Sequence, residues 1–227
     1  MSKDLNGKTL GIIHAAVFTA ASLEPIAREV MPEVSIMHIG DDTIQRDNLN
    51  APVGSIPKVN FFKFTTYARF LEEAGVNLIM LACSTFNQAV EHARAMISVP
   101  MLQIDRPMMD LAVRQGKRVG LLATLPSTVP SSERLLLQAA ADAGKQIEIT
   151  TLLNNEAFGV LRAGDPKKHN EMLLDDIDKL SGRVDAIVLA QVSMAVLEEQ
   201  VKGARVPVYN SGCTGFERAR EMLLEME

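Results

Sequence analysis

The chain of 227 residues has no Trp, two Tyr, two Cys and no surplus of basic residues. Lys and Arg number 23 against 28 Asp and Glu, which gives a net charge of −5, and no basic block is present. A phosphate-binding stripe needs clustered cations, and a base-stacking platform needs aromatic rings. We therefore expect no nucleic-acid partner.

Long apolar runs are also missing. The longest uninterrupted run covers residues 78–83, whereas a membrane helix needs roughly 18 residues or more, so we expect no membrane partner. Residues 10–23 are mostly apolar and follow two lysines, as in a secretory signal. However, Asp4 and His14 are poor signal-peptide residues, and residues 11–13 have a counterpart in mid-chain. We therefore expect a cytoplasmic protein without a signal peptide.

Two cysteines, Cys83 and Cys213, are too few for a disulfide scaffold in a chain of this size. This favours a reducing compartment and a chemical role for the thiols. The four histidines have no metal-ligand spacing with each other or with a cysteine. The acidic cluster at residues 175–178 lies in a helical pattern and is interpreted as a solvated helix face. We expect no metal.

What the chain does contain is an internal repeat. Three apolar segments recur in the same order at offsets of 107 to 109 residues, which indicates duplication. The repeated pairs are 11–13 with 120–122, 76–82 with 184–190, and 99–102 with 206–209.

Each repeated segment is short and rich in Val, Ile and Leu, which is typical of strands buried on both faces of a parallel sheet. Apolar residues at helical spacing predict helices around residues 23–30, 61–71 and 135–139, the last two ending near Gly75 and Gly144. This alternation predicts an α/β fold with two pseudo-symmetric parallel-sheet lobes. We assign the Phe and most Met residues to the core.

The stretch from Gly40 to Pro57 is rich in Asp, Asn, Pro and Gly. An irregular connection of this length is often a lid or a binding loop. We expect it to cover the mouth of the first lobe's site and exclude water, with a solvated surface loop as the alternative.

In open α/β sheets, ligands bind beyond the carboxyl ends of the strands, where helix N-termini offer unpaired N–H groups. The residues that follow the apolar runs are mostly hydroxyls, amides and thiols, which suits a small carboxylate ligand. A cysteine on a strand-to-helix turn, such as Cys83, also has a reason to be acidic. The candidate site residues are His14, Cys83, Ser84, Thr85, Asn87, Thr124, Ser127, Thr128, Gln191, Ser193, Asn210, Ser211 and Cys213.

Residues 81–85, Leu-Ala-Cys-Ser-Thr, resemble the first cysteine motif of the aspartate/glutamate racemase superfamily. That superfamily also includes hydantoin racemases, maleate isomerases and arylmalonate decarboxylases. Residues 120–124, followed by Ser127-Thr128-Val129 and Ser131, are similar to a second motif of the superfamily. Residues 185–190 are similar to the strand that delivers its second cysteine. The resemblance extends over nearly the whole chain.

The resemblance implies two α/β lobes facing each other across a cleft, no cofactor, and a homo-oligomer. The first lobe would contain residues 1–110 and 209–227, and the second residues 111–208. One cysteine from each lobe would stand on opposite faces of a small carboxylate substrate, an amino acid or a related compound. One thiolate would remove the α-proton and the other thiol would return a proton, through an enolate-like intermediate. The implied enzyme is a cofactor-independent isomerase.

One position departs from the family pattern. Where the second cysteine would stand, this chain has Gln191, whose carboxamide neither gives nor takes a proton near neutral pH. Three interpretations stay open. The first is a racemase or epimerase in which Cys83 works with Cys213, His14 or Ser193. The second is a one-thiol decarboxylase or cis-trans isomerase, and the third is a non-catalytic binding protein for a small carboxylate.

Overall fold

The computed structural model describes residues 4–226, and the chain divides into two compact units. The first unit contains the residues up to Ile104 and those from Gly212 onward, and the second contains Asp105–Ser211. Each unit is built on one four-stranded sheet in which all strands are parallel. This is the α/β class that the alternation of apolar runs and helical patterns predicts.

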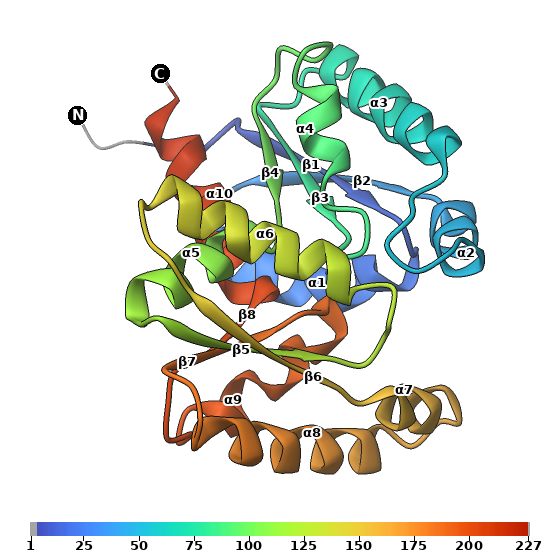
Figure 1. The fold of residues 1–227 in the computed structure, drawn as a ribbon. Helices are drawn as coiled ribbons and strands as arrows, with labels where there is room; N and C mark the ends of the chain where they lie inside the picture. Colours follow the sequence, from blue (N-terminus) through green and yellow to red (C-terminus); the bar gives the residue numbers. More distant parts are fainter. Residues whose placement is uncertain (1–3, 227) are drawn as a thin grey trace. The chain divides into compact units, whose positions relative to one another are not determined.

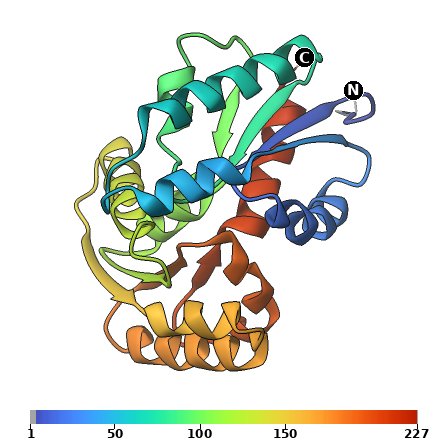
Figure 2. The same ribbon diagram turned by 90° about the vertical axis from the view of Figure 1, so that its right-hand side faces the viewer.

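The sheet of the first unit has the strand order β2-β1-β3-β4. Helices α3 and α4 pack on one of its faces, and α1 and α10 cover the other (Figures 1 and 2). The chain thus returns to this sheet with its last helix, and the Lys8 amine donates a hydrogen bond to the Met226 carbonyl there. The elements are β1 (Thr9–His14), α1 (Phe18–Val30), β2 (Ser35–Gly40), α2 (Asp42–Asn50), α3 (Lys58–Glu73), β3 (Leu78–Ala82), α4 (Ala89–Ala93), β4 (Met101–Gln103) and α10 (Ser211–Glu225).

The second unit has the strand order β6-β5-β7-β8. Helices α5 and α6 form one apolar cluster with β5 and β7, while α8 and the short helices after β7 form another on the opposite face (Figure 1). The elements are α5 (Arg106–Gln115), β5 (Arg118–Ala123), α6 (Val129–Asp142), β6 (Glu148–Leu153), α7 (Asn155–Arg162), α8 (Pro166–Ser181), β7 (Ala186–Leu189), η1 (Val192–Leu197), α9 (Glu198–Val201) and β8 (Val208–Asn210).

The repeated sequence segments occupy equivalent strands in the two units, with equivalent register. Gly11 of β1 pairs with Ile79 of β3, and Gly120 of β5 pairs with Ile187 of β7. A Cβ at Gly11 would lie 2.8 Å from the Leu71 side chain. Helix α3 thus packs directly on the strand, and a larger residue at position 11 would require the Leu71 side chain to shift.

The three predicted helices are confirmed by α1, α3 and α6. Helix α3 buries Phe64, Ala68 and Leu71 on one side, as the spacing predicts. Gly75 has φ +79° and Gly144 has φ +64°. In this left-handed conformation glycine is favoured, so both helices end near these residues.

The lobe boundaries differ by a few residues from those expected at residues 110 and 209. Strand β8 pairs with β7, so Tyr209 and Asn210 belong to the second unit. Helix α5 packs against β7 and β8, which assigns its first residues to the second unit as well.

The prediction of an irregular connection between Gly40 and Pro57 is wrong, because this stretch contains helix α2. The Asp41 carboxylate accepts a hydrogen bond from the Thr43 N–H and caps the helix, and Ile44 is buried beneath it. The capping side chain of Asp41 and the buried Ile44 thus stabilise a helix that the polar composition of this stretch does not indicate.

The assignment of every Phe to the core is also wrong. Phe64, Phe86 and Phe216 are fully buried, but Phe62 and Phe70 on the outer side of α3 are exposed. Within residues 4–226, no helix is both long enough and apolar enough to cross a bilayer.

Candidate active site

The candidate site residues gather at the carboxyl edge of each sheet, where the strand order reverses. In the first unit β1 lies between β2 and β3, so the reversal falls at the ends of β1 and β3. His14 pairs there with Ala82, the residue before Cys83. In the second unit the equivalent ends are those of β5 and β7, followed by Thr124 and Gln191. Such reversal points are where open α/β sheets bind ligands.

Cys83 directly follows β3, is half-buried and forms no disulfide. Ser84, beside it, is buried, and its hydroxyl has no hydrogen-bond partner within residues 4–226. Thr85 and Asn87 continue the same turn, and the Asn87 carbonyl accepts a hydrogen bond from the Gln103 side chain. The sequence thus places a thiol and an unengaged hydroxyl side by side.

Cys83 lies on the connection between β3 and α4, as expected of a strand-to-helix turn. A run of turns separates the thiol from α4, which begins at Ala89 and is only five residues long. Within this run of turns, the apolar Phe86 inserts into the core against Phe64.

Cys213 lies in the first turn of α10, and this turn packs on the first unit. A Cβ at Gly215 would lie 2.7 Å from Ile104, whose N–H donates to the carbonyl of Leu81 in β3. The α10 turn therefore lies at the edge of the sheet to which Cys83 belongs. Both thiols belong to one unit, whereas Gln191 belongs to the other.

His14 is fully buried and heads a chain of hydrogen bonds. The Thr19 hydroxyl donates to the Ala16 carbonyl at 2.7 Å, so its oxygen accepts from His14 Nδ1 at 2.8 Å. His14 Nε2 then accepts from His38 Nδ1 at 2.9 Å, and His38 Nε2 lies 3.0 Å from a Glu24 carboxylate oxygen. Both ring nitrogens of His14 are engaged, so we assign it to positioning rather than to direct substrate contact.

Burial and hydrogen bonding determine the charge states of His14 and Glu24 in this hydrogen-bonded series. Burial, together with the facing His38, lowers the pKa of His14 to about 4. Partial burial raises the pKa of Glu24, but hydrogen bonds from His38 and Arg28 outweigh it and leave that pKa below its ordinary value. Because its pKa is lowered, His14 stays neutral across the physiological pH range, and its Nε2 remains a hydrogen-bond acceptor. Sequence reasoning missed Thr19, Glu24 and His38, since they lie on other elements.

We expect His14 to make the protein sensitive to acid. Its pKa falls from 6.5 when unfolded to about 4 when folded, so the unfolded state binds more protons between these values. The free energy of unfolding then rises as the pH increases from about 4 to 6.5. Acidification over the same range lowers it by about 3 kcal/mol. Urea unfolding across this range should show a shallower slope for His14→Asn. The matched variant His92→Asn, at an exposed histidine, should keep the wild-type slope, and equal slopes in all three proteins would contradict the assignment.

In the second unit, Gln191 is buried against the end of β5. Its side-chain oxygen accepts hydrogen bonds from the Thr124 N–H at 2.6 Å and from the Thr124 hydroxyl at 3.0 Å. Two donors at the carboxyl edge thus converge on one oxygen, an arrangement that also suits a carboxylate oxygen.

Helix α6 begins beside these donors. Thr128 is buried just before its first turn, and the hydroxyls of Ser127 and Ser132 have no hydrogen-bond partner within the described residues. The N-terminus of a helix of 14 residues carries a positive partial charge and unpaired N–H groups. This part of the edge favours an anion.

The remaining candidates differ in their surroundings. Ser193 is half-buried in η1, and Asn210 is buried and donates to the Glu198 carboxylate. Ser211 is fully buried at the start of α10, and its hydroxyl has no partner in the part of the chain described. Glu198 is a carboxylate that sequence reasoning missed, because its partner lies one strand later.

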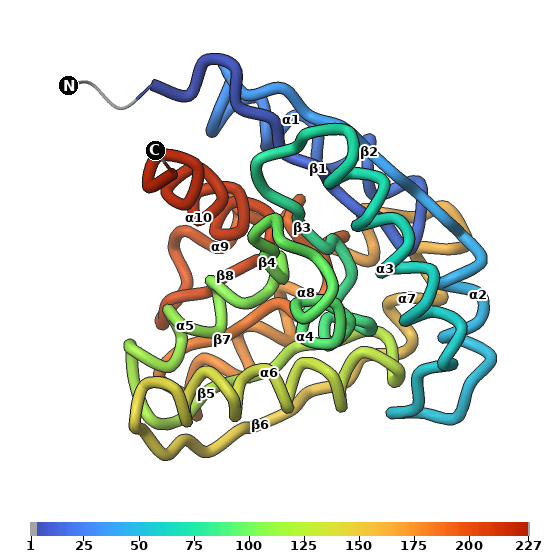
Figure 3. The backbone as a smooth tube through the Cα atoms, turned by 90° about the horizontal axis from the view of Figure 1, so that it is seen from above, coloured from blue at the N-terminus to red at the C-terminus, as the bar shows by residue number. Residues whose placement is uncertain are grey.

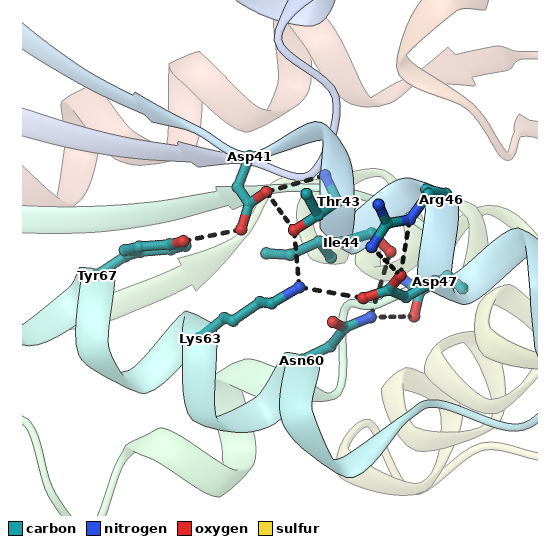
Figure 4. A network of polar contacts seen from close by, with 9 residues as sticks. Asp41, Thr43, Ile44, Arg46, Asp47, Asn60, Lys63 and Tyr67 are labelled. Atoms are coloured by element: carbon teal, nitrogen blue, oxygen red, sulfur yellow. Dashed lines mark hydrogen bonds and ion pairs between the residues drawn. The ribbon is translucent and has the colours of Figure 1, made fainter.

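Helix α2 is fixed to this edge and to α3 by a polar network (Figure 4). The Asp41 N–H donates to the His14 carbonyl, and the Asp41 carboxylate accepts from the Tyr67 hydroxyl at 2.7 Å. Lys63 donates to the Thr43 hydroxyl at 2.7 Å and to Asp47 at 3.0 Å. The helix therefore lies next to the end of β1 and is held from both sides.

We expect Asp41→Ala to lower the free energy of unfolding by about 1–2 kcal/mol, because it removes the α2 cap and leaves the Tyr67 hydroxyl without its acceptor. Urea unfolding measures the loss. Glu29→Ala, at an exposed acidic residue of α1, is the control and should change stability little. A loss no larger than the control's would show that the network does not anchor α2.

The acidic cluster at residues 175–178 is only partly a solvated face. Asp175 and Asp178 are exposed, but Asp176 is buried and accepts hydrogen bonds from Asn154 and Lys179. Within residues 4–226 no group of three or more His, Cys, Asp or Glu side chains is placed to hold a metal ion.

This chain is similar to known proteins in sequence and in fold. The glutamate racemase of Trichodesmium erythraeum is 27% identical over 149 residues, 65% of this chain and 52% of that protein. The chain thus spans about half the length of that relative. The glutamate racemase of Aquifex aeolicus is 26% identical over 200 residues, 85% of this chain and 74% of that one. The solved aspartate racemase of Picrophilus torridus superposes with a TM-score of 0.70 at 16% identity, covering 97% of this chain and 100% of that one, which shows a shared fold.

The family model for Asp/Glu/Hydantoin racemase matches residues 63–219. This range includes Cys83, the Thr124 strand, Gln191 and Cys213, and it covers well over half of the chain. The predicted membership of the Asp/Glu racemase superfamily is confirmed. The chain belongs to the Asp/Glu/Hydantoin racemase family.

Proposed function

We propose that the protein is a cofactor-independent racemase or epimerase of a small carboxylate, an amino acid or a close relative, and that Cys83 exchanges the α-proton. The observation that carries this proposal is the position of Cys83. It stands at the point where the strand order reverses in the first unit, next to the unengaged hydroxyl of Ser84.

The chemistry requires a base and donors for negative charge. A Cys83 thiolate takes the α-proton, and the electron pair of the C–H bond moves into the carboxylate to form an enediolate. O–H and N–H donors aimed at the developing charge lower this barrier. Ser84 and Thr85 supply hydroxyls beside the thiol. In the second unit, the unengaged Ser127 hydroxyl just before α6 is a donor of the same kind, while the Thr124 N–H and hydroxyl are held by the Gln191 side-chain oxygen.

Helix α2 supports the same assignment. It is tied to the carbonyls of His14 and Ala15 by the N–H groups of Asp41 and Gln45. We expect this fixed helix, rather than an irregular lid, to restrict water at the end of β1 and so protect the enediolate from solvent protons.

The number of working thiols separates the two leading forms of this reaction. Cys213 is a second acid/base candidate, but α10 packs it on the unit that also carries Cys83, and Gln191 has no acid/base capacity. This favours one thiol as the principal acid/base. A one-thiol decarboxylase or cis-trans isomerase is the second candidate, favoured by the same Gln191.

The test is an assay panel in deuterated water with amino acids, hydantoins, malonates and maleate. Deuterium incorporation with loss of optical rotation supports a racemase, while carbon dioxide release supports a decarboxylase. Iodoacetamide labelling as a function of pH adds a second readout. A Cys83 thiol that reacts only at alkaline pH, with no turnover of any compound, would favour a binding protein.

A further inference from the structure

We propose that His38 is a positioning residue of the first unit: it carries one proton more than a neutral imidazole, and both of its N–H groups tie β2 to β1 and to α1. The reaction at Cys83 then requires this protonated form. The requirement for activity rests on the proposed function, whereas the proton count of His38 depends only on its hydrogen bonds.

Two histidine rings lie side by side near the end of β1. Helix α1 runs next to β1 and β2 (Figure 3), and the rings of His14 and His38 have centroids 5.1 Å apart. His14 Nε2 lies 2.9 Å from His38 Nδ1, and His38 Nε2 lies 3.0 Å from a carboxylate oxygen of Glu24 on α1. His14 is fully buried, while the side chains of His38 and Glu24 are 29% and 37% exposed. The hydrogen-bonded series therefore runs from the surface into the core.

The three hydrogen bonds of this series need three ring protons. The Thr19 hydroxyl donates to the Ala16 carbonyl at 2.7 Å, so its oxygen accepts a proton from His14 Nδ1. A second proton lies between the two rings, and a third lies between His38 and the carboxylate, which can only accept. Two neutral imidazoles carry only two ring N–H groups between them. One ring of the pair is therefore an imidazolium.

The surroundings place the extra proton on His38. Both ring nitrogens of His14 are engaged by Thr19 and His38, and burial together with the facing His38 lowers the pKa of His14 to about 4. His38 instead faces Glu24. Partial burial raises the pKa of Glu24, but hydrogen bonds from His38 and Arg28 leave it below its ordinary value, so this group is a carboxylate at neutral pH. His38 then donates from both of its ring nitrogens.

The other charged groups around this pair of rings have partners of their own. Arg28, on α1, shares the Glu24 carboxylate with His38. The Asp42 carboxylate, at the start of α2, accepts a hydrogen bond from the Val17 N–H. Helix α10 covers the same face of the sheet, and beyond its first turn its buried side chains are apolar. Glu24 is thus the carboxylate that pairs with His38.

The extra proton supports the connection between β1 and α1. The Ala16 carbonyl in this connection accepts both the N–H and the hydroxyl of Thr19. Without the extra proton, two ring protons cannot serve three hydrogen bonds, so either one bond of the series breaks or the Thr19 hydroxyl leaves Ala16 and donates to His14. His14 pairs with Ala82, the residue before Cys83. Loss of the proton therefore changes the support of the connection beside the thiol.

Nitrogen-15 NMR of the imidazole rings in the full chain tests the proton count. At about pH 6.5, the ordinary pKa of histidine, we expect the imidazolium signature on His38 and a neutral ring with Nδ1–H on His14. As the pH rises, the Thr19 amide signal should shift with the same midpoint as His38, because this N–H shares the Ala16 carbonyl with the hydroxyl. The exposed His92 should titrate without any effect on Thr19. An imidazolium on His14, or a Thr19 signal that does not follow His38, overturns the proposal.

The pH profile of α-proton exchange tests the positioning role, with the compound of the assay panel that exchanges fastest. In the wild type, exchange should fall at alkaline pH with the midpoint at which His38 loses its proton. The Cys83 thiolate forms as the pH rises, so this loss cannot come from Cys83. His38→Gln carries no charge, and it should lower exchange by about tenfold or more and abolish the alkaline loss.

Two further variants complete this experiment. His38→Arg keeps a charge and several N–H donors at every pH used, so it should restore exchange relative to His38→Gln and extend it to higher pH. His92→Gln is the matched control and should keep the wild-type profile. Circular dichroism checks that the variants are folded. A folded His38→Gln protein with the wild-type profile contradicts the positioning role. Absence of exchange in every protein, wild type included, contradicts the proposed function instead, and the nitrogen signals then still decide the proton count of His38.

Discussion

Replacing Cys83 with serine is expected to lower α-proton exchange by about 10²- to 10⁴-fold, the range that a positioned acid or base contributes. An alcohol is a much weaker acid than a thiol, so serine at residue 83 cannot hold the thiolate that takes the proton. Sulfur and oxygen side chains have nearly the same shape, and Cys83 is half-buried in a turn. The fold should therefore survive. Mass spectrometry of deuterium incorporated from solvent measures the loss.

Cys213→Ser is the matched control for this experiment. It removes the other thiol, also half-buried and also packed on the first unit. With one working thiol, this variant should keep most of the exchange. With two, both variants should be severely impaired, and each should still incorporate deuterium into one enantiomer only. Full activity of the Cys83→Ser variant would overturn the assignment of Cys83.

Replacing Gln191 with cysteine is expected to create or increase racemisation by about 10²-fold, because it adds an acid/base at the repeat position equivalent to Cys83. The substitution also removes the oxygen that accepts from the Thr124 N–H and hydroxyl. Buried donors without a partner cost about 1–3 kcal/mol, so the variant should be less stable even as it gains activity.

Ser193→Cys provides a positional control for Gln191→Cys. It introduces a thiol two residues further on, in η1, without touching Thr124. Polarimetry and deuterium exchange should then change in Gln191→Cys and not in Ser193→Cys. A folded Gln191→Cys protein with unchanged exchange and rotation would show that Gln191 does not face the substrate.

The sequence determined the fold class because the information is local and repeated. Buried parallel strands need continuous apolar runs, and helices need apolar residues every three or four positions. Both patterns occur twice at nearly one offset, so β3 could be matched with β7 from residues 76–82 and 184–190, and β1 with β5 from residues 11–13 and 120–122. The placement of Cys83 at the carboxyl edge followed from the same rule.

Only the tertiary structure decided which side chains meet. The chain His14, His38 and Glu24 joins three elements, and no spacing within one element encodes it. The bond of Gln191 to Thr124 joins residues 67 positions apart. The hidden helix α2 depended on a cap at Asp41 and on a buried contact of Ile44, which outweigh a polar composition. Long-range contacts of this kind arise from packing between elements.

The outer face of α3 shows the same division. Helical spacing correctly predicted that Phe64 and Leu71 face the core, since the inner stripe is periodic. It did not distinguish these buried residues from Phe62 and Phe70, which are equally apolar but lie on the opposite side of the helix and are exposed. Burial of an aromatic ring depends on what packs over it, and for this face the single chain supplies no cover. Periodicity therefore determines the direction in which a side chain points, while the neighbouring elements decide whether it is enclosed.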